Sequence, residues 1–244
     1  MKSLDTYYDS AIALIKNVNE TQKANVESVA EMFADCINHN GVVQLVGIGH
    51  GRTFGMELGY RAGGLVPFHE FMSRDLVLRG AISEEEAKDE VFAQKPENAQ
   101  IWKSTYALDP NDMFTFSTFT ATEPLLVEMA KQAKEEGRKV LLVTSRAAAE
   151  KAKAEGNPSV LDYADQVLDT LAGTEDRIVD INGFKAGQLN TIAANTMAQM
   201  LTADTYACLT AQGKEAPVLL SDNVTGADEH NRRMARPYDG RWNS

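Results

Sequence analysis

Three short polar segments of this 244-residue chain carry residues that can bind a hydroxylated or anionic ligand. The first, residues 47–52, reads Gly-Ile-Gly-His-Gly-Arg. Gly49 and Gly51 let the backbone approach a ligand, amides at the start of a following helix attract anions, and Arg52 adds a cation. The alternative is a tight strand-to-helix turn without a ligand. The dinucleotide-binding fingerprint is not matched, because the third glycine is misplaced and the next strand does not end in the required acid.

The second segment, residues 117–122, precedes a predicted helix and has four hydroxyl groups in six residues. They belong to Ser117, Thr118, Thr120 and Thr122. A helix cap by Thr122 needs only one hydroxyl, so the cluster favours hydrogen bonding to a phosphate or a sugar. The third segment, residues 144–146, offers the hydroxyl of Ser145 and a cation, and its alternative is a solvated loop.

Two further sites hold candidates for proton transfer. Glu57 follows Gly49 by eight residues, on the helix expected to begin in the glycine loop, and the alternative is that it faces solvent. The run Asp-Glu-His-Asn-Arg at residues 228–232 places Glu229 beside His230. A histidine next to acids can donate a proton around neutral pH, whereas the alternative is a charged, solvated tail helix.

Residue spacing argues against metal and nucleophilic chemistry. The four histidines show no His-x-x-x-His pattern, and the two cysteines, Cys36 and Cys208, form no Cys-x-x-Cys pair. A Gly-x-Ser-x-Gly elbow is also missing from the sequence. We therefore predict a site without a metal ion or a cofactor.

Composition restricts the partners. A formal net charge of −11 argues against nucleic acid, because binding to its phosphates requires a basic surface. No segment reaches the ~18 consecutive apolar residues that cross a bilayer, and residues 1–5 lack a signal-peptide core. Two isolated cysteines fit a reducing compartment. We therefore predict a cytoplasmic protein that binds a small molecule and neither nucleic acid nor membrane.

Hydrophobic patterning predicts the elements that position these residues. Strands are predicted at 42–46, 112–116, 139–143 and 166–169. Helices follow the first two strands, and this alternation indicates a parallel sheet with right-handed crossovers.

The rest of the chain is predicted to be mainly helical. We predict two helices within residues 4–40 and one long, alanine-lined helix at residues 187–212. The acid-rich residues 82–100 are predicted to form a helical segment on the surface. Residues 41–244 are expected to form a single domain, and residues 1–40 to pack on it or on a partner subunit.

Several runs of sequence together resemble a known family. Val-Gln-Leu-Val-Gly-Ile-Gly-His at residues 43–50 is followed by Glu-Leu at 57–58 and by Tyr-Arg-Ala-Gly-Gly-Leu-Val-Pro at 60–67. With Ala-Asp-Gln-Val-Leu-Asp at 164–169 and the run at 228–232, they resemble a bacterial subgroup of sugar isomerase (SIS) domain proteins, described as phosphosugar-binding or phosphoheptose-isomerase-like. The resemblance extends from about residue 5 to residue 238.

The resemblance implies a fold and an assembly. The fold is a doubly wound, flavodoxin-like α/β sheet of five parallel strands flanked by helices, with the N-terminal helical extension. The assembly is a homodimer or homotetramer with active sites at subunit interfaces. In aldose–ketose isomerases of the family, a glutamate on the first helix is the base and a histidine assists ring opening. Glu57 matches the base, and His50 and His230 are candidates for the second role.

The phosphate-binding motif departs from the family. The usual Ser-x-Ser-Gly is replaced by Thr-Phe-Thr-Ala at residues 118–121, so the hydroxyls persist while the glycine is lost. Glu123 also places a carboxylate in the first turn of the following helix, which makes a phosphate less favourable there.

Three functions are therefore considered. The leading hypothesis is an aldose–ketose isomerase that acts on a sugar or sugar phosphate through an enediolate. The first alternative is a non-catalytic sugar-binding protein that regulates another process. The second is a lyase or etherase that acts on an amino-sugar ether, because the same base could start a β-elimination.

Overall fold

The centre of the molecule is a five-stranded parallel sheet in the order β2-β1-β3-β4-β5. The computed structural model describes residues 3–59, 61–88 and 91–241, so Tyr60 of the run at 60–67 lies outside the described residues. The strands are β1 Val43–Gly47, β2 Phe68–Glu70, β3 Met113–Ser117, β4 Val140–Thr144 and β5 Gln166–Asp169. β1, β3 and β4 are buried along their full length, as expected for parallel strands covered on both faces. The predicted fold class and four predicted strands are confirmed.

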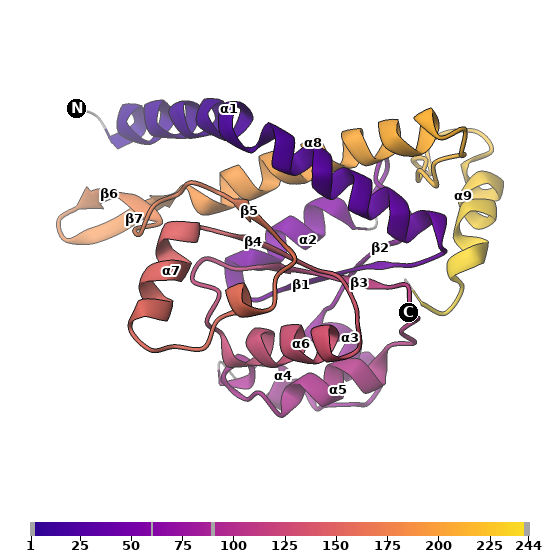
Figure 1. The fold of residues 1–244 in the computed structure, drawn as a ribbon, viewed down its shortest axis with the longest axis horizontal. Helices are drawn as coiled ribbons and strands as arrows, with labels where there is room; N and C mark the ends of the chain where they lie inside the picture. Colours follow the sequence, from indigo (N-terminus) through magenta and orange to yellow (C-terminus); the bar gives the residue numbers. More distant parts are fainter. Residues whose placement is uncertain (1–2, 60, 89–90, 242–244) are drawn as a thin grey trace.

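Helices cover the two faces of the sheet. α1 Ser3–Asn38, α2 Arg52–Leu58 and α8 Asn190–Ala211 share a core with one face. α3 Ser73–Leu78, α5 Asn98–Thr105 and α6 Pro124–Glu135 share a second core with the other face. Figure 1 shows α1 and α8 side by side on one side of the strands, with α5 and α6 on the opposite side. The other helical segments are α4 Glu84–Lys88, α7 Arg146–Ala154, α9 Ala227–Ala235, and the short 3₁₀ turns η1 Gly49–Gly51, η2 Phe92–Gln94, η3 Val160–Asp162 and η4 Arg236–Tyr238.

The N-terminal prediction of two helices is wrong, because α1 is one continuous helix. Its buried positions continue at helical spacing through the middle of the segment, at Ala11, Leu14, Val18, Gln22 and Val26. Neither glycine nor proline interrupts residues 3–38. The long helix predicted at 187–212 also begins later, because residues 187 and 188 belong to β7.

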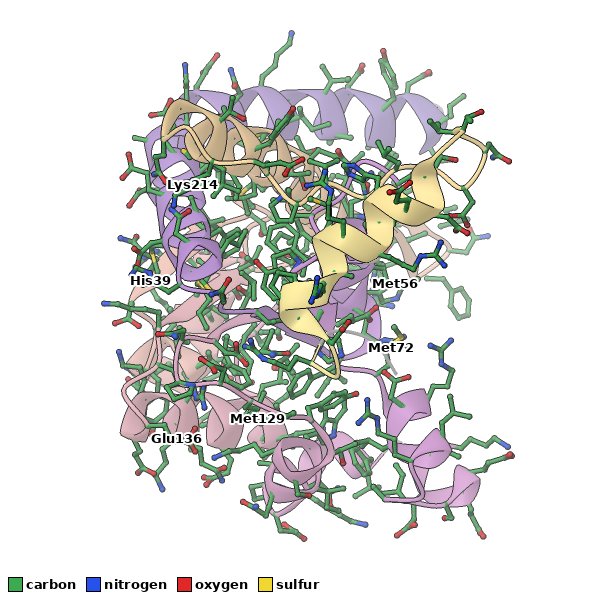
Figure 2. The ribbon with its side chains drawn as sticks, turned by 90° about the vertical axis from the view of Figure 1, so that its right-hand side faces the viewer. His39, Met56, Met72, Met129, Glu136 and Lys214 are labelled. Atoms are coloured by element: carbon green, nitrogen blue, oxygen red, sulfur yellow. The ribbon has the colours of Figure 1, made fainter. Side chains whose placement is uncertain are left out.

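Two features lie outside this three-layer body. β6 Arg177–Ile181 and β7 Phe184–Gln188 form an antiparallel hairpin that projects from the sheet (Figure 1). α9 lies at the opposite end, where Met234 and Ala235 pack with Val42 at the amino end of β1. Figure 2 faces this end and shows α9 in front, with the labelled His39, Lys214 and Glu136 just beyond the ends of α1, α8 and α6. Among the described residues, no helix has the length and apolar character to cross a membrane.

A buried polar network ties β2, β1 and β3 together. His69 Nδ1 donates to Gln44 Oε1 at 2.7 Å, and Gln44 Nε2 donates to Asp112 Oδ2 at 3.0 Å. The other oxygen of Asp112 accepts from the Val42 amide at 2.7 Å and from Arg241 near the C-terminus. Burial, and secondarily the charge of Arg79, lowers the pKa of His69 from 6.5 to about 4. At pH values between about 4 and 6.5, His69 is therefore protonated in the unfolded chain and neutral in the folded chain.

This exclusion predicts acid-sensitive stability. The folding contribution of neutral His69 is fully present above pH 6.5 and is lost as pH falls towards 4, at about 1.4 kcal/mol per pH unit. His69→Gln retains a donor for Gln44 and should lose less stability than wild type, by about 2 kcal/mol, on going from pH 7 to pH 5. Urea unfolding at the two pH values measures the difference. The exposed His39→Gln is the matched control, and an unchanged pH dependence in His69→Gln would refute the prediction.

Candidate functional site

The predicted polar loops lie together at the carboxyl edge of the sheet. β1 and β3 are adjacent and in register from Val43 with Met113 to Gly47 with Ser117, so the loops that follow them start side by side. The helices after these strands, α2 and α6, pack on opposite faces. This arrangement is the switch point of a doubly wound sheet, where such folds bind their ligands.

The glycine loop turns sharply against the end of β3. A Cβ atom at Gly51 would lie 2.0 Å from the carbonyl oxygen of Ser117, and one at Gly47 would lie 2.6 Å from the backbone of Gly51. Gly49 has a φ of 56°, with open space where a Cβ would be. The ring of His50 is exposed, so the loop presents Gly49 and His50 outwards while Gly51 closes onto β3.

The hydroxyl loop after β3 binds one of its own carboxylates. The buried Thr118 Oγ1 donates to Glu123, at 2.6 Å from Oε1 and 2.8 Å from Oε2, and accepts from the Ala121 amide at 3.3 Å. Ala121 has a φ of 57°, the left-handed conformation that glycine adopts most easily. The alanine therefore keeps a backbone shape suited to the family's glycine, and Glu123 lies against the hydroxyl loop at the start of α6.

The other predicted hydroxyls divide into two groups. Thr122 Oγ1 donates to Thr120 Oγ1 at 3.1 Å, and both side chains are half-buried. The alternative role of Thr122 as a helix cap is wrong, because the cap position of α6 is Glu123. Ser145 is fully buried, caps α7 through Ala148 and donates to the Gly173 carbonyl at 2.5 Å, so both of its hydrogen-bonding roles are taken within the fold.

Glu57 lies near the far end of α2, away from the glycine loop. Glu57 follows Gly51 by six residues, which is about 9 Å along the helix axis. Its half-buried carboxylate accepts from Gln199 of α8 and lies 3.6 Å from Arg61 Nη2. Arg61 also lines a polar cavity of about 350 Å³ with the loop at residues 219–223 and with Asn231 of α9.

His230 and Glu229 lie on α9, at the amino end of the sheet and away from the polar loops. His230 Nε2 is 2.9 Å from the Val218 carbonyl, and Glu229 is exposed. Within one chain the predicted site therefore separates into a binding group at the carboxyl edge and a second group, with Glu57 and His230, around the ends of α2 and α9.

The residue patterns did not single out Glu70. It ends β2, is 6% exposed and has its Oε1 atom 3.3 Å from Arg52 Nε of the glycine loop. Burial raises the pKa of this carboxyl, while Arg52 acts in the opposite direction. The only sequence signal was an acid directly before Phe71, in a three-residue strand too short and too polar to be predicted.

In the described parts of the chain, no cluster of three or more histidine, cysteine or acidic residues could hold a metal ion.

The two loop glycines give a matched pair of substitutions. A Cβ atom at residue 49 would contact no other atom, so Gly49→Ala introduces only the strain of a left-handed alanine. We expect it to lower the free energy of unfolding by about 1 kcal/mol. Gly51→Ala must push the loop away from Ser117, so we expect about 3 kcal/mol, the upper range for overpacking. Chemical unfolding measures both free energies. Equal losses would show that the contact between loop and strand does not constrain the site.

Comparison with known proteins agrees with this architecture. A family model described as "SIS domain" matches residues 6–145. UPF0309 proteins of Listeria monocytogenes and Brucella canis are 25% and 28% identical, over 98% and 97% of this chain and 96% of each relative. The solved phosphoheptose isomerase of Neisseria gonorrhoeae has a TM-score of 0.50 at 16% identity, over 85% of this chain and 97% of that one.

A second solved structure, from Silicibacter pomeroyi and assigned as a phosphosugar isomerase, has a TM-score of 0.54 at 14% identity. The match covers 87% of this chain but 54% of that protein. At these identities the two structures show the shared fold alone. The family model, by contrast, spans more than half of the 244 residues. The chain therefore belongs to the SIS domain family.

Proposed function

We propose that this protein binds a sugar at the carboxyl edge of the sheet and interconverts its aldose and ketose forms. The observation that carries the proposal is the meeting of the glycine loop and the hydroxyl loop at the β1–β3 switch point, in a chain of the SIS family. Backbone amides near Gly49 and Gly51 would face the sugar oxygens, and Thr118, Thr120 and Thr122 would supply hydroxyls. Sugar phosphates occur in the names of its structural neighbours.

The reaction needs a base and a group that moves a proton between oxygens. Glu57 would remove the proton from the carbon next to the carbonyl, which gives an enediolate, and return it to the neighbouring carbon. His230 or His50 would transfer the proton between the two oxygens. Loop amides would stabilise the negative charge that develops on oxygen. No cofactor takes part in this chemistry.

A second subunit is part of the proposal. Glu57 and His230 lie away from the polar loops of their own chain, so a homodimer or homotetramer would bring them to a neighbour's loops. The outer surface near Glu57 supports an interface. Met56, next to Glu57 in the sequence, is 58% exposed, and Tyr206 of α8 is 51% exposed.

The charge of the sugar is inferred from Glu123. Its carboxylate already accepts from Thr118, beside the start of α6, where a phosphate would have to bind. Like charges at 4 Å repel by about 4 kcal/mol at an effective dielectric of 20. We therefore infer a preference for a neutral or weakly charged sugar over a dianionic sugar phosphate.

The non-catalytic alternative is also supported by an observation. Glu57 is engaged by Gln199 and Arg61, and a base must release such contacts before it can act. A binding protein would use the same loops without turnover. Thermal-shift screening against sugars, sugar phosphates and sugar sulfonates identifies the ligand, since saturation at 100 times Kd adds roughly 2.7 kcal/mol of stability. Product analysis by NMR distinguishes isomerisation from elimination.

Glu57→Gln tests the base directly. We expect folding and sugar affinity to stay near wild type, while kcat falls by about 10²–10⁴-fold, because general-base catalysis is lost. Exchange of solvent deuterium into the sugar should fall in parallel. Glu150→Gln, at an exposed glutamate on α7, is the control and should retain activity. Wild-type deuterium exchange in Glu57→Gln would remove this residue from the mechanism.

Mixing of subunits tests the shared site. If one chain supplies Glu57 and His230 and its neighbour supplies the polar loops, a dimer of Glu57→Gln and the double loop variant Thr118→Val, Thr120→Val contains one intact site. An equimolar mixture of the two inactive variants, unfolded and refolded together, should then recover about a quarter of wild-type activity. The absence of recovery, or a monomer in light scattering at micromolar concentration, would contradict an interface active site.

Glu123→Gln tests the preference for charge. Removal of the carboxylate should raise the affinity for a sugar phosphate by about 10-fold or more and leave the affinity for the parent sugar nearly unchanged, because only the phosphate meets the repulsion. Isothermal titration of the two ligands against wild type and variant measures this. A wild type that binds the phosphate far more tightly, with a preference unchanged in Glu123→Gln, would refute the inference.

A further inference from the structure

A cavity of about 220 Å³ lies beside the glycine loop, on the α6 side of the sheet. Gly47, Ile48, Gly49 and Arg52 form one wall. The opposite walls come from Phe71 after β2, from the start of α3, and from α4, η2, α5 and α6. They are mostly apolar, with the residues Phe71, Ser73, Ala87, Phe92, Trp102 and Leu125. The cavity is therefore continuous with the loop that would hold a sugar, yet most of its lining cannot hydrogen-bond to one.

Trp102 supplies an unpaired hydrogen-bond donor in this apolar lining. Its side chain is 5% exposed and stacks on Phe71, with ring centroids 5.3 Å apart and planes at 18°. The indole Nε1 is buried and has no hydrogen-bond partner within the described part of the chain. An unpaired buried donor is unfavourable, so an acceptor brought in by a ligand would gain a hydrogen bond.

The chemistry of the lining selects the kind of group that can enter. The indole N–H only donates, so the group must carry an acceptor. A sugar hydroxyl would also bury its own donor against apolar side chains, which is costly. An acyl group avoids this cost, because its carbonyl oxygen only accepts and its alkyl part contacts Phe71, Phe92 and Leu125. The volume is below the 300–1,000 Å³ typical of whole-ligand pockets, so it suits a substituent.

We propose that this cavity is a subsite for the acyl substituent of the ligand, and that the ligand class is an amino sugar N-acylated at a carbon other than the two that exchange the carbonyl group. The carbonyl oxygen of the acyl group accepts from Trp102 Nε1, and the sugar ring lies at Gly49 and Arg52. The position of the ring rests on the proposed function. The affinity of the cavity for an acyl group depends only on its own lining.

A fragment titration tests the subsite without any sugar. The chain has two tryptophans, and Trp102→Phe identifies the indole signal of Trp102 in ¹H–¹⁵N NMR spectra. We expect N-propylacetamide to shift this signal saturably, with a Kd on the order of millimolar for so small a ligand. 1,2-Propanediol, which has hydroxyls in place of the amide, should leave it unmoved. An unmoved Trp102 signal at roughly 100 mM amide would overturn the proposal.

Two alanine variants locate the binding. Ala87→Leu fills the cavity from α4 and should weaken amide binding by about 10-fold or more, whereas Ala152→Leu, at a partly buried alanine on α7, should not change it. Trp102→Phe keeps an aromatic ring on Phe71 but lacks the N–H, and should weaken binding about 5-fold in ligand-detected NMR. Equal affinity in Ala87→Leu and wild type would also overturn the proposal.

The sugar measurements separate this proposal from the proposed function. If sugars bind wild type, 6-butanamido-6-deoxyglucose should bind more tightly than 6-acetamido-6-deoxyglucose, by about 4-fold per added methylene, and Ala87→Leu should abolish this gain. If sugars bind without a gain in affinity from the longer acyl chain, and the Trp102 signal does not move, the subsite is refuted. The proposed function would then still stand. A saturable amide site in a protein that binds no sugar of the screen would refute the proposed function and the amino-sugar class of the ligand, and would leave the acyl subsite standing.

Discussion

The contact between Gly51 and the carbonyl oxygen of Ser117 is the constraint on which the site depends. With hydrogen atoms in place of side chains at Gly47 and Gly51, the loop after β1 folds directly onto the end of β3. α2 can then start at the edge of the sheet and pack on one face, while α6 starts beside it and packs on the other. The two helix starts and the two polar loops thus meet at one point, and the cavity lined by Trp102 opens against the same loop.

The hydroxyl loop combines an alanine in a left-handed conformation with a glutamate that binds its buried threonine. Ala121 holds the left-handed conformation at a strain of about 1–2 kcal/mol. Two hydrogen bonds to its carbonyl oxygen offset this strain, from the Val160 amide at 2.9 Å and Ser159 Oγ at 3.1 Å, and its methyl group is fully buried. Glu123 then satisfies the Thr118 hydroxyl within the chain. The loop is therefore fixed by hydrogen bonds within the chain and holds an acidic side chain against its hydroxyl group.

The separation of the candidate catalytic residues follows from the length of the elements. α2 carries Glu57 away from the carboxyl edge, and α9 packs Met234 against the amino end of β1, which holds His230 far from the polar loops. Both residues nevertheless lie on partly exposed surface. The polar loops and the candidate acid–base residues therefore do not converge in one chain, and the proposed subunit interface is what would bring them together.

The sequence alone determined four of the five strands of the sheet and the places of the polar loops. Apolar runs at the residues of β1, β3 and β4 are strands because both of their faces are buried, and loops after parallel strands must meet at one edge. β2 was not predictable, since His69 and Glu70 are buried there only through Gln44 and Arg52, which are distant in sequence. The same holds for the cap role of Ser145, the bond between Thr118 and Glu123 and the orphan N–H of Trp102. Local patterns report which side chains prefer burial, whereas hydrogen-bond partners and cavities arise only when distant segments pack together.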